Sequence, residues 1–222
     1  MTATDSTPRT ALLAGASGLI GTALLALLRD SPRYRHTHVL LRRALPGVAA
    51  DARVTPHVID FGALPALPAV DDVFIALGTT IKVAGSQEAF RRVDLDHVVA
   101  TARAARAAGA RRLAVVSALG ADPKSTVFYN RVKGEMQAAI ALLGFESVVV
   151  AQPSLLIGDR STLGQPTRSA EVWITRLLSP VMTLVPRGVR PIEARQVAHA
   201  LLTATLNAPP GVHILSSGDM QT

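Results

Sequence analysis

Cysteine is absent from this sequence, which excludes disulfide bonds and thiolate chemistry. Aromatic residues account for only 4% of the chain, too few for the stacking surfaces that single-stranded nucleic-acid binders use. Lysine is scarce as well, so arginine supplies most of the positive charge behind the net value of +7. The arginines are scattered in pairs along the chain rather than gathered on one stripe, and we therefore expect no nucleic-acid partner.

A long apolar run is also missing near the N-terminus. Residues 1–7 are polar and include Asp5, and the apolar run that follows is only a few residues long. This pattern predicts neither a signal peptide nor a membrane span, and we expect a cytoplasmic protein. Among the six histidines, His36 and His38 lie two apart with no third ligand at a suitable spacing, so no metal site is expected.

Apolar runs alternate with helical patterns along the 222 residues. Runs such as residues 73–77 and 148–151 are apolar without alternation, as expected for strands covered by helices on both faces. The sequence therefore predicts a single α/β domain with a doubly wound parallel sheet, whose ligands bind at the carboxyl ends of the strands. The predicted strands are residues 10–14, 38–41, 53–60, 72–77, 112–117, 147–152 and 211–216, and the predicted helices are residues 19–30, 87–108, 126–143 and 191–202.

Three glycines, Gly15, Gly18 and Gly21, are spaced three apart between the first predicted strand and the first predicted helix. In this setting glycine allows a sharp turn, and the free N–H groups at the helix start can bind a pyrophosphate. We expect the whole turn to contact a dinucleotide, including the intervening residues Ser17, Leu19 and Ile20. The alternative is a glycine-rich turn that binds nothing.

Two arginines, Arg42 and Arg43, follow the second predicted strand, where a fold that prefers NAD usually has an acidic residue. Guanidinium groups can grip a 2′-phosphate, and the Ser17 hydroxyl can assist them, so the pair favours NADP(H) over NAD(H). Two solvated arginines are the alternative. After the third strand, Asp60 and Phe61 are placed to contact adenine, although Asp60 can equally begin a turn.

A Tyr129–Lys133 step lies within a predicted helix, so both side chains share one face. A free phenol titrates near pH ~10, and an adjacent ammonium group favours its phenolate and brings its proton within reach of neutral pH. This pair is a candidate proton donor, with Ser117 placed to hydrogen-bond a substrate carbonyl. An exposed Tyr and Lys on an amphipathic helix are the alternative. At the end of the fourth strand, Gly78 permits close coenzyme approach, together with Leu77, Thr79 and Thr80, and a bare turn is the alternative.

Together these motifs resemble the short-chain dehydrogenase/reductase superfamily, in its atypical branch. The segments Gly78-Thr-Thr, Val93-Asp-Leu-Asp96, Ser117-Ala-Leu-Gly-Ala121 and Tyr129-Asn-Arg-Val-Lys133 look like the Tat-interacting oxidoreductase group and its bacterial relatives. The resemblance implies a Rossmann-type fold with a coenzyme-binding core in residues 1–157 and a substrate-side and C-terminal segment in residues 158–222. It also implies that Lys133 binds the nicotinamide ribose and that Pro153, Ser154 and Leu155 close against the nicotinamide.

The resemblance implies an NADP(H)-dependent oxidoreductase that acts on a small carbonyl or alcohol substrate, with Tyr129 as general acid. A non-catalytic NADP(H)-binding regulatory or interaction protein is the alternative, because the group includes regulatory members. Many superfamily enzymes have an asparagine in the helix after the fourth strand, where this chain has Asp94, Asp96 and His97. We expect a monomer or homodimer, in which the apolar segment 171–186 serves as a lid, a dimer contact or ordinary core.

Overall fold

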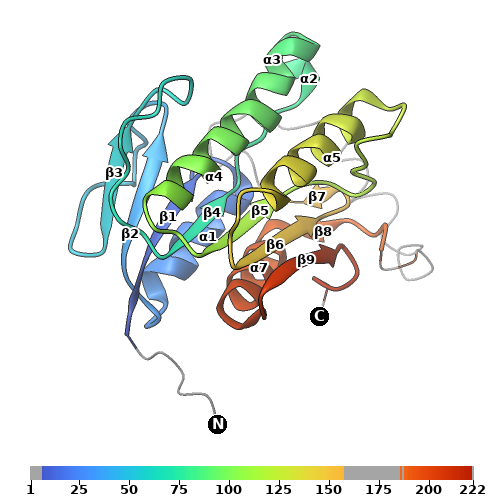
Figure 1. The fold of residues 1–222 in the computed structure, drawn as a ribbon. Helices are drawn as coiled ribbons and strands as arrows, with labels where there is room; N and C mark the ends of the chain where they lie inside the picture. Colours follow the sequence, from blue (N-terminus) through green and yellow to red (C-terminus); the bar gives the residue numbers. More distant parts are fainter. Residues whose placement is uncertain (1–6, 158–185, 187, 222) are drawn as a thin grey trace.

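Seven parallel strands form one sheet in the computed structural model, which describes residues 7–157, 186 and 188–221. The strand order is β3-β2-β1-β4-β5-β6-β9, and every neighbouring pair is parallel (Figure 1). The order reverses at β1, as in a Rossmann-type fold, and the predicted fold class is confirmed. The strands are β1 (Arg9–Ala14), β2 (Tyr34–Leu41), β3 (Val54–Val58), β4 (Asp72–Ile75), β5 (Arg112–Val116), β6 (Ser147–Gln152) and β9 (Gly211–Ser216).

Helices cover both faces of the sheet (Figure 1). One face carries α1 (Leu19–Asp30) and α7 (Ala194–Asn207), which pack against each other. The other face carries α3 (Gln87–Arg91), the π-helical segment η1 (Arg92–His97), α4 (Val98–Ala107) and α5 (Phe128–Ala141). Three shorter elements lie near the carboxyl ends of the strands: α2 (Ile81–Ala84), β7 (Leu156–Ile157) and β8 (Ile192–Glu193).

The central strands are buried on both faces, which explains their unbroken apolar sequence. In β1, Ala11 and Leu13 join the core under α1 and α7, whereas Leu12 and Ala14 join the core under α4 and α5. All six residues of β1 are buried. Successive side chains of a strand point to opposite faces, so one apolar run supplies two cores.

Three predicted elements differ most from the structure. The helix predicted over residues 191–202 is α7, Ala194–Asn207, and β8, Ile192–Glu193, precedes it. Strand β2 begins at Tyr34 rather than His38, because pairing with β1 holds its first residues and β3 pairs with it only from Thr37 onward. The predicted helix 87–108 is one continuous helical segment in which η1 interrupts the α-helical hydrogen bonding. Residues 171–185 of the predicted apolar segment lie outside the described residues.

The carboxyl edge of the sheet gathers the loops that the sequence singles out. The glycine turn follows β1, Arg42 and Arg43 follow β2, and Gly78 follows β4. Strands β5 and β6 end beside Ser117 and Pro153 at the same edge. In the part of the chain that the structure describes, no helix is both long and apolar enough to cross a bilayer.

Candidate functional site

The glycine turn needs two of its three glycines for its own geometry. Gly15 has a φ of +96°, and a Cβ there would lie 2.5 Å from the Ala76 carbonyl carbon. A Cβ on Gly21 would overlap the Gly15 carbonyl oxygen. Gly18 differs, because the nearest atom to its Cβ position is the Gly15 oxygen at 3.5 Å, an ordinary contact distance. The protein itself therefore leaves room at Gly18, where a bound pyrophosphate would need the backbone to approach closely.

Helix α1 begins at this turn with its backbone N–H groups directed toward the carboxyl edge. Gly18 is the N-cap residue and supplies no side-chain hydrogen bond, and the first turn contains no acidic residue. Unpaired N–H groups and the positive end of the helix dipole favour an anion at such a start. Ser17 is exposed, Leu19 half-buried and Ile20 buried, so Ser17 lies on the open side of the turn and Ile20 anchors the helix in the core.

Of the residues predicted to contact the adenosine end of the coenzyme, three are exposed to solvent and one is buried in the core. Arg42 and Arg43 are exposed after β2. Asp60 is also exposed and accepts a hydrogen bond of 2.8 Å from the Gly62 N–H, so it does begin a turn. Phe61 is only 4% exposed and stacks on His97, with their ring centroids 6.0 Å apart.

His97 is a neighbour of this region that was not predicted as a coenzyme ligand. Burial lowers the pKa of His97; the carboxylates of Asp96 and Asp60 oppose this effect, and the guanidinium groups of Arg92 and Arg42 reinforce it. His97 belongs to η1, which therefore connects the Asp60–Phe61 turn with the helices that carry the acid–base residues.

The loop after β4 is tied to η1 by a buried carboxylate. The Thr79 N–H donates a hydrogen bond of 2.8 Å to Asp94 Oδ2. A Cβ on Gly78 would lie 3.3 Å from Asp94 Oδ1 and 3.8 Å from Lys133 Nζ, so glycine brings this backbone close to both charged groups. Thr80 ends the loop by capping α2 through a hydrogen bond from the Val83 N–H. Leu77 is half-buried and packs against the adjoining core.

Helix α5 carries Tyr129, Lys133 and Gln137 at successive spacings of four residues, which places them on one face. Lys133 is 3% exposed, and its ammonium nitrogen lies 2.7 Å from Asp94 Oδ1. The half-buried ring of Tyr129 packs against Phe90, with their centroids 5.4 Å apart. The structure thus brings the predicted Lys133 next to the Gly78 loop, with Asp94 between the two.

Ser117 takes part in a polar chain that sequence reasoning missed. The Gln137 side-chain amide donates to the Ser117 hydroxyl oxygen, and Gln152 Nε2 donates to Gln137 Oε1 over 3.2 Å. Ser117 is 4% exposed and Ala118 beside it is buried as well. The spacing of eight residues between Tyr129 and Gln137 was a signal that could have placed Gln137 in the site.

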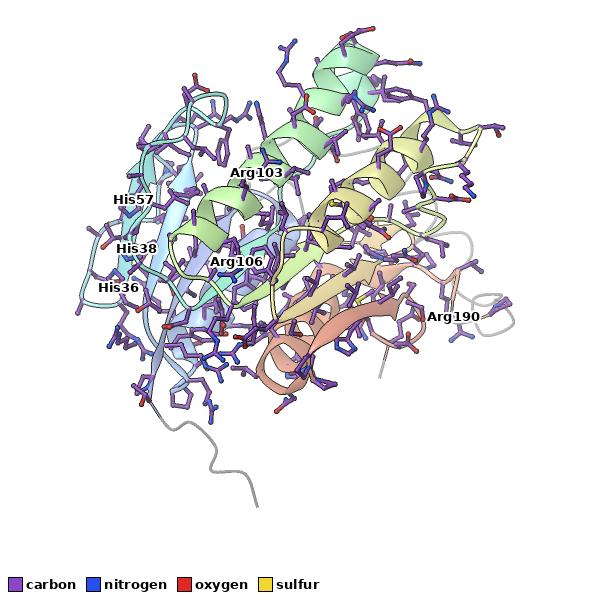
Figure 2. All side chains as sticks on the ribbon, viewed as in Figure 1. His36, His38, His57, Arg103, Arg106 and Arg190 are labelled. Atoms are coloured by element: carbon purple, nitrogen blue, oxygen red, sulfur yellow. The ribbon has the colours of Figure 1, made fainter. Side chains whose placement is uncertain are left out.

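The loop after β6 is fastened to the C-terminal part of the chain. The Pro153 carbonyl accepts a hydrogen bond of 2.9 Å from the Leu119 N–H. The Ser154 hydroxyl donates to the backbone carbonyl of Arg190, whose side chain points away from the sheet in Figure 2. Ser217 donates to Ser154 over 2.9 Å. Leu155 accepts from the Ile192 N–H, so residues 153–155 are fixed by both neighbouring segments.

A separate groove of about 1160 Å³ lies between α1 and α7, on the opposite face of the sheet from α5. Its lining includes Leu19 and Thr22 at the start of α1 and His199 on α7, but none of the predicted acid–base residues. The residues predicted for acid–base chemistry lie instead at the carboxyl edge, on the other face of the sheet. In the described residues no group of three His, Asp or Glu side chains has the geometry of a metal site.

Solved structures of similar fold bind a nicotinamide coenzyme. The chain is similar to MoeE5 in complex with UDP-glucose and NAD, with a TM-score of 0.68 and 18% identity, over 93% of this chain and 76% of MoeE5. It is similar to the Bordetella bronchiseptica enzyme WbmG in complex with NAD, with a TM-score of 0.68 and 15% identity, over 97% and 75% of the two chains. At such identities the likeness establishes the fold.

Curated relatives are more similar in sequence. The chain is 33% identical over 216 residues to the mitochondrial protein fmp52 of Aspergillus fumigatus, which covers 90% of each chain. It is 34% identical over 173 residues to protein HTATIP2 of Rattus norvegicus, covering 76% of this chain and 69% of the relative. The similarity to HTATIP2 confirms the resemblance to the Tat-interacting group.

The expectation of a cytoplasmic location is wrong. The FMP52 proteins of Eremothecium gossypii, Aspergillus fumigatus and Emericella nidulans are all named mitochondrial. The reasoning failed because a polar N-terminal segment argues only against a secretory signal and a membrane span, and delivery to an organelle requires neither.

One family accounts for the glycine turn, the Gly78 loop and the acid–base helix together. The sequence of residues 15–145, more than half of the chain, matches the NAD(P)H-binding family. This range begins at Gly15 and ends just beyond α5, so it contains every residue discussed above from the glycine turn to Gln137. The chain belongs to the NAD(P)H-binding family.

Proposed function

We propose that this protein is an NADP(H)-dependent oxidoreductase of the atypical short-chain dehydrogenase/reductase type. It transfers a hydride to or from a small carbonyl or alcohol substrate, with Tyr129 as general acid or base. The observation that carries the proposal is the convergence of the Gly78 loop and α5, where Lys133 Nζ lies within 3.8 Å of the Gly78 Cβ position. A family that binds NAD(P)H supplies the coenzyme class.

The coenzyme is held by groups that extend from α1 to β3. The uncapped start of α1 and the open backbone at Gly18 bind the pyrophosphate. The exposed guanidinium groups of Arg42 and Arg43 bind the 2′-phosphate, which makes NADP(H) the preferred coenzyme. Asp60 lies at the adenine end of the proposed site, and the buried Phe61 next to it anchors the same turn in the core.

When bound, the coenzyme supplies or accepts the hydride. Tyr129 would donate its phenolic proton to the substrate oxygen in the direction of carbonyl reduction and would accept a proton from the alcohol in the direction of oxidation. Lys133 holds the nicotinamide ribose. Ser117 accepts a hydrogen bond from Gln137 and so has its own hydroxyl proton available for the substrate oxygen.

The experiment that tests this function begins with fluorescence titrations of the purified protein with NADPH and with NADH. We expect tighter binding of NADPH, and R42A/R43A should lose about tenfold or more in NADPH affinity while NADH binding stays the same. R103A removes an exposed arginine from α4 and serves as the matched control (Figure 2). Absence of binding to either coenzyme would refute the proposal.

The same preparations then report on the chemistry, with a panel of small aldehydes and ketones as substrates. Y129F should bind NADPH like the wild type and turn over about 10²- to 10⁴-fold more slowly, since it lacks the proton donor. Equal turnover by Y129F would remove Tyr129 from the reaction.

A non-catalytic NADP(H)-binding protein is the second candidate. It is favoured by two features of the site: Asp94 neutralises the Lys133 charge, and the buried Ala118 replaces a second hydroxyl group after Ser117. This candidate predicts NADPH binding without turnover on the carbonyl panel, together with capture of a protein partner that depends on NADP(H). Capture that is insensitive to the coenzyme would count against it.

A further inference from the structure

Asp94 is a buried carboxylate in the middle of the candidate site. It lies in η1, where consecutive residues Asp94 and Leu95 are both buried. A π-helical turn contains more than the usual number of residues, so it rotates side chains relative to a regular α-helix, and such segments are frequent at functional sites. In this chain the π-helical segment directs a carboxylate inward, toward the loop after β4 and toward α5.

The two oxygens of this carboxylate bind two different parts of the site. Oδ1 lies 2.7 Å from Lys133 Nζ, and Oδ2 accepts the hydrogen bond of 2.8 Å from the Thr79 N–H. The side chains of Lys133 and Asp94 are only 4% and 1% exposed. Asp94 thus connects the loop predicted to contact the coenzyme with the lysine predicted to hold its ribose.

The ion pair also changes the charge that Tyr129 experiences. A lone buried ammonium group one helical turn away would favour the phenolate of Tyr129. Here the ammonium is paired with a carboxylate at hydrogen-bonding distance, so the two groups together carry no net charge. The packed elements also carry other titratable or charged groups, of which Arg91 and Glu135 form an ion pair that joins α3 to α5. The remaining ones are Glu88 on α3, Arg92, Asp96 and His97 on η1, and Arg131 on α5.

We propose that Asp94 is a positioning residue, whose carboxylate fixes Lys133 to the Gly78–Thr79 loop and cancels the lysine charge beside Tyr129. This inference concerns the same site as the proposed function and rests on it for the role of Tyr129. Its structural content is independent of the coenzyme, because it concerns the charge of a pair of side chains in the unliganded protein.

The chain offers a direct readout, since it contains only two tyrosines, Tyr34 and Tyr129. Burial and the neighbouring carboxylate of Asp72 raise the pKa of Tyr34 far above its usual range. Phenolate absorbance that develops while the protein is still folded therefore reports on Tyr129. Y129F should abolish this signal, and circular dichroism at each pH confirms that the protein is still folded.

We expect the absorbance midpoint of D94N to lie about one pH unit below that of the wild type, because the lysine charge is no longer compensated. The double variant D94N/K133Q carries a neutral pair of similar shape, and its midpoint should return to the wild-type position. If Asp94 had only a structural role, adding K133Q to D94N would not raise the absorbance midpoint back to the wild-type position.

Each outcome decides the inference. If D94N titrates like the wild type, Asp94 does not set the charge beside Tyr129, and the inference is wrong. If D94N does not fold, the double variant D94N/K133Q still tests the inference. An absorbance midpoint at the wild-type position supports it. A midpoint about one pH unit above the wild type overturns it, because the lysine charge would then act uncompensated in the native site. Coenzyme titration of the wild type runs alongside, so a failure of the proposed function shows there and not in the tyrosine absorbance.

Discussion

Glycines of one motif have different physical tasks, and the structure separates them. Gly15 requires glycine for its positive φ and its contact with Ala76, and Gly21 requires it for its contact with the Gly15 carbonyl. Gly18 has neither constraint in the unliganded protein. Spacing alone could not distinguish these cases, because the sequence pattern treats the three positions alike.

This difference leads to opposite expectations for two alanine variants. G21A should lower the free energy of unfolding by about 2 kcal/mol or more, since its Cβ overlaps backbone that cannot move freely. G18A should fold with nearly wild-type stability and bind NADPH at least about tenfold more weakly, because its Cβ enters the space proposed for the pyrophosphate. Urea denaturation and coenzyme titration measure the two effects. Undiminished NADPH binding by G18A would argue against the pyrophosphate site at this turn.

Sequence alone predicts those site residues that act together with a neighbour a few positions away in the chain. It misses those whose partners are brought close only by the fold. Tyr129 and Lys133 could be paired from helical spacing. Asp94 was visible only as a departure from an expected asparagine, since nothing in the sequence places it against Lys133. Gln137 was missed because its partner Ser117 comes from a different element.

At the scale of elements, unbroken apolar runs identified the central strands but not the extent of β2. Its first residues, Tyr34, Arg35 and His36, become part of the strand because β1 pairs with them. The π-helical segment η1 was likewise invisible, because the same side chains suit a continuous α-helix. Strands β7 and β8, of two residues each, are too short to leave a periodic signal.

The edge formed by β2 and β3 carries a row of three histidines (Figure 2). His38 Nδ1 lies 3.0 Å from His57 Nε2, and the rings of His36 and His38 are 4.8 Å apart. Burial, followed by the charges of His36 and His57, lowers the pKa of His38 to about 4. Burial and His36 also lower the pKa of His57. The folded protein therefore favours the neutral imidazoles of His38 and His57.

Because the unfolded chain binds these protons near its ordinary histidine pKa, the protein should lose stability as the pH falls from about 6.5 toward about 4. The rings are only partly buried and solvent screens their charges, so we expect His38 to contribute on the order of 1 kcal/mol. In urea denaturation, H38N should lose less of its free energy of unfolding than the wild type does when the pH falls over this range. H213Q, at the opposite edge of the sheet, is the control and should keep the wild-type pH dependence.

Across the whole molecule, a carboxylate is buried at each end of the parallel strands, at the amino edge where they begin and at the carboxyl edge where they end. The two carboxylates have different sets of partners. At the carboxyl edge, Asp94 forms an ion pair with Lys133 and accepts a hydrogen bond from the Thr79 N–H. At the amino edge, Asp72 accepts hydrogen bonds from Tyr34, Arg9 and Arg112, which come from β2, β1 and β5. The amino-edge carboxylate thus holds four strands together, whereas the carboxyl-edge carboxylate links the loop after β4 to helix α5.

The amino-edge network should therefore stabilise the whole fold. D72N leaves two largely buried guanidinium groups without their carboxylate and should lower the free energy of unfolding by about 3–5 kcal/mol. Y34F removes one hydrogen bond of 2.7 Å and should cost about 1 kcal/mol. E146Q, which breaks the exposed Arg111–Glu146 pair nearby, should cost less than about 1 kcal/mol. Urea denaturation ranks the three variants, and a D72N protein as stable as E146Q would show that packing alone holds these strands, since the buried carboxylate would then contribute no more than a solvated one.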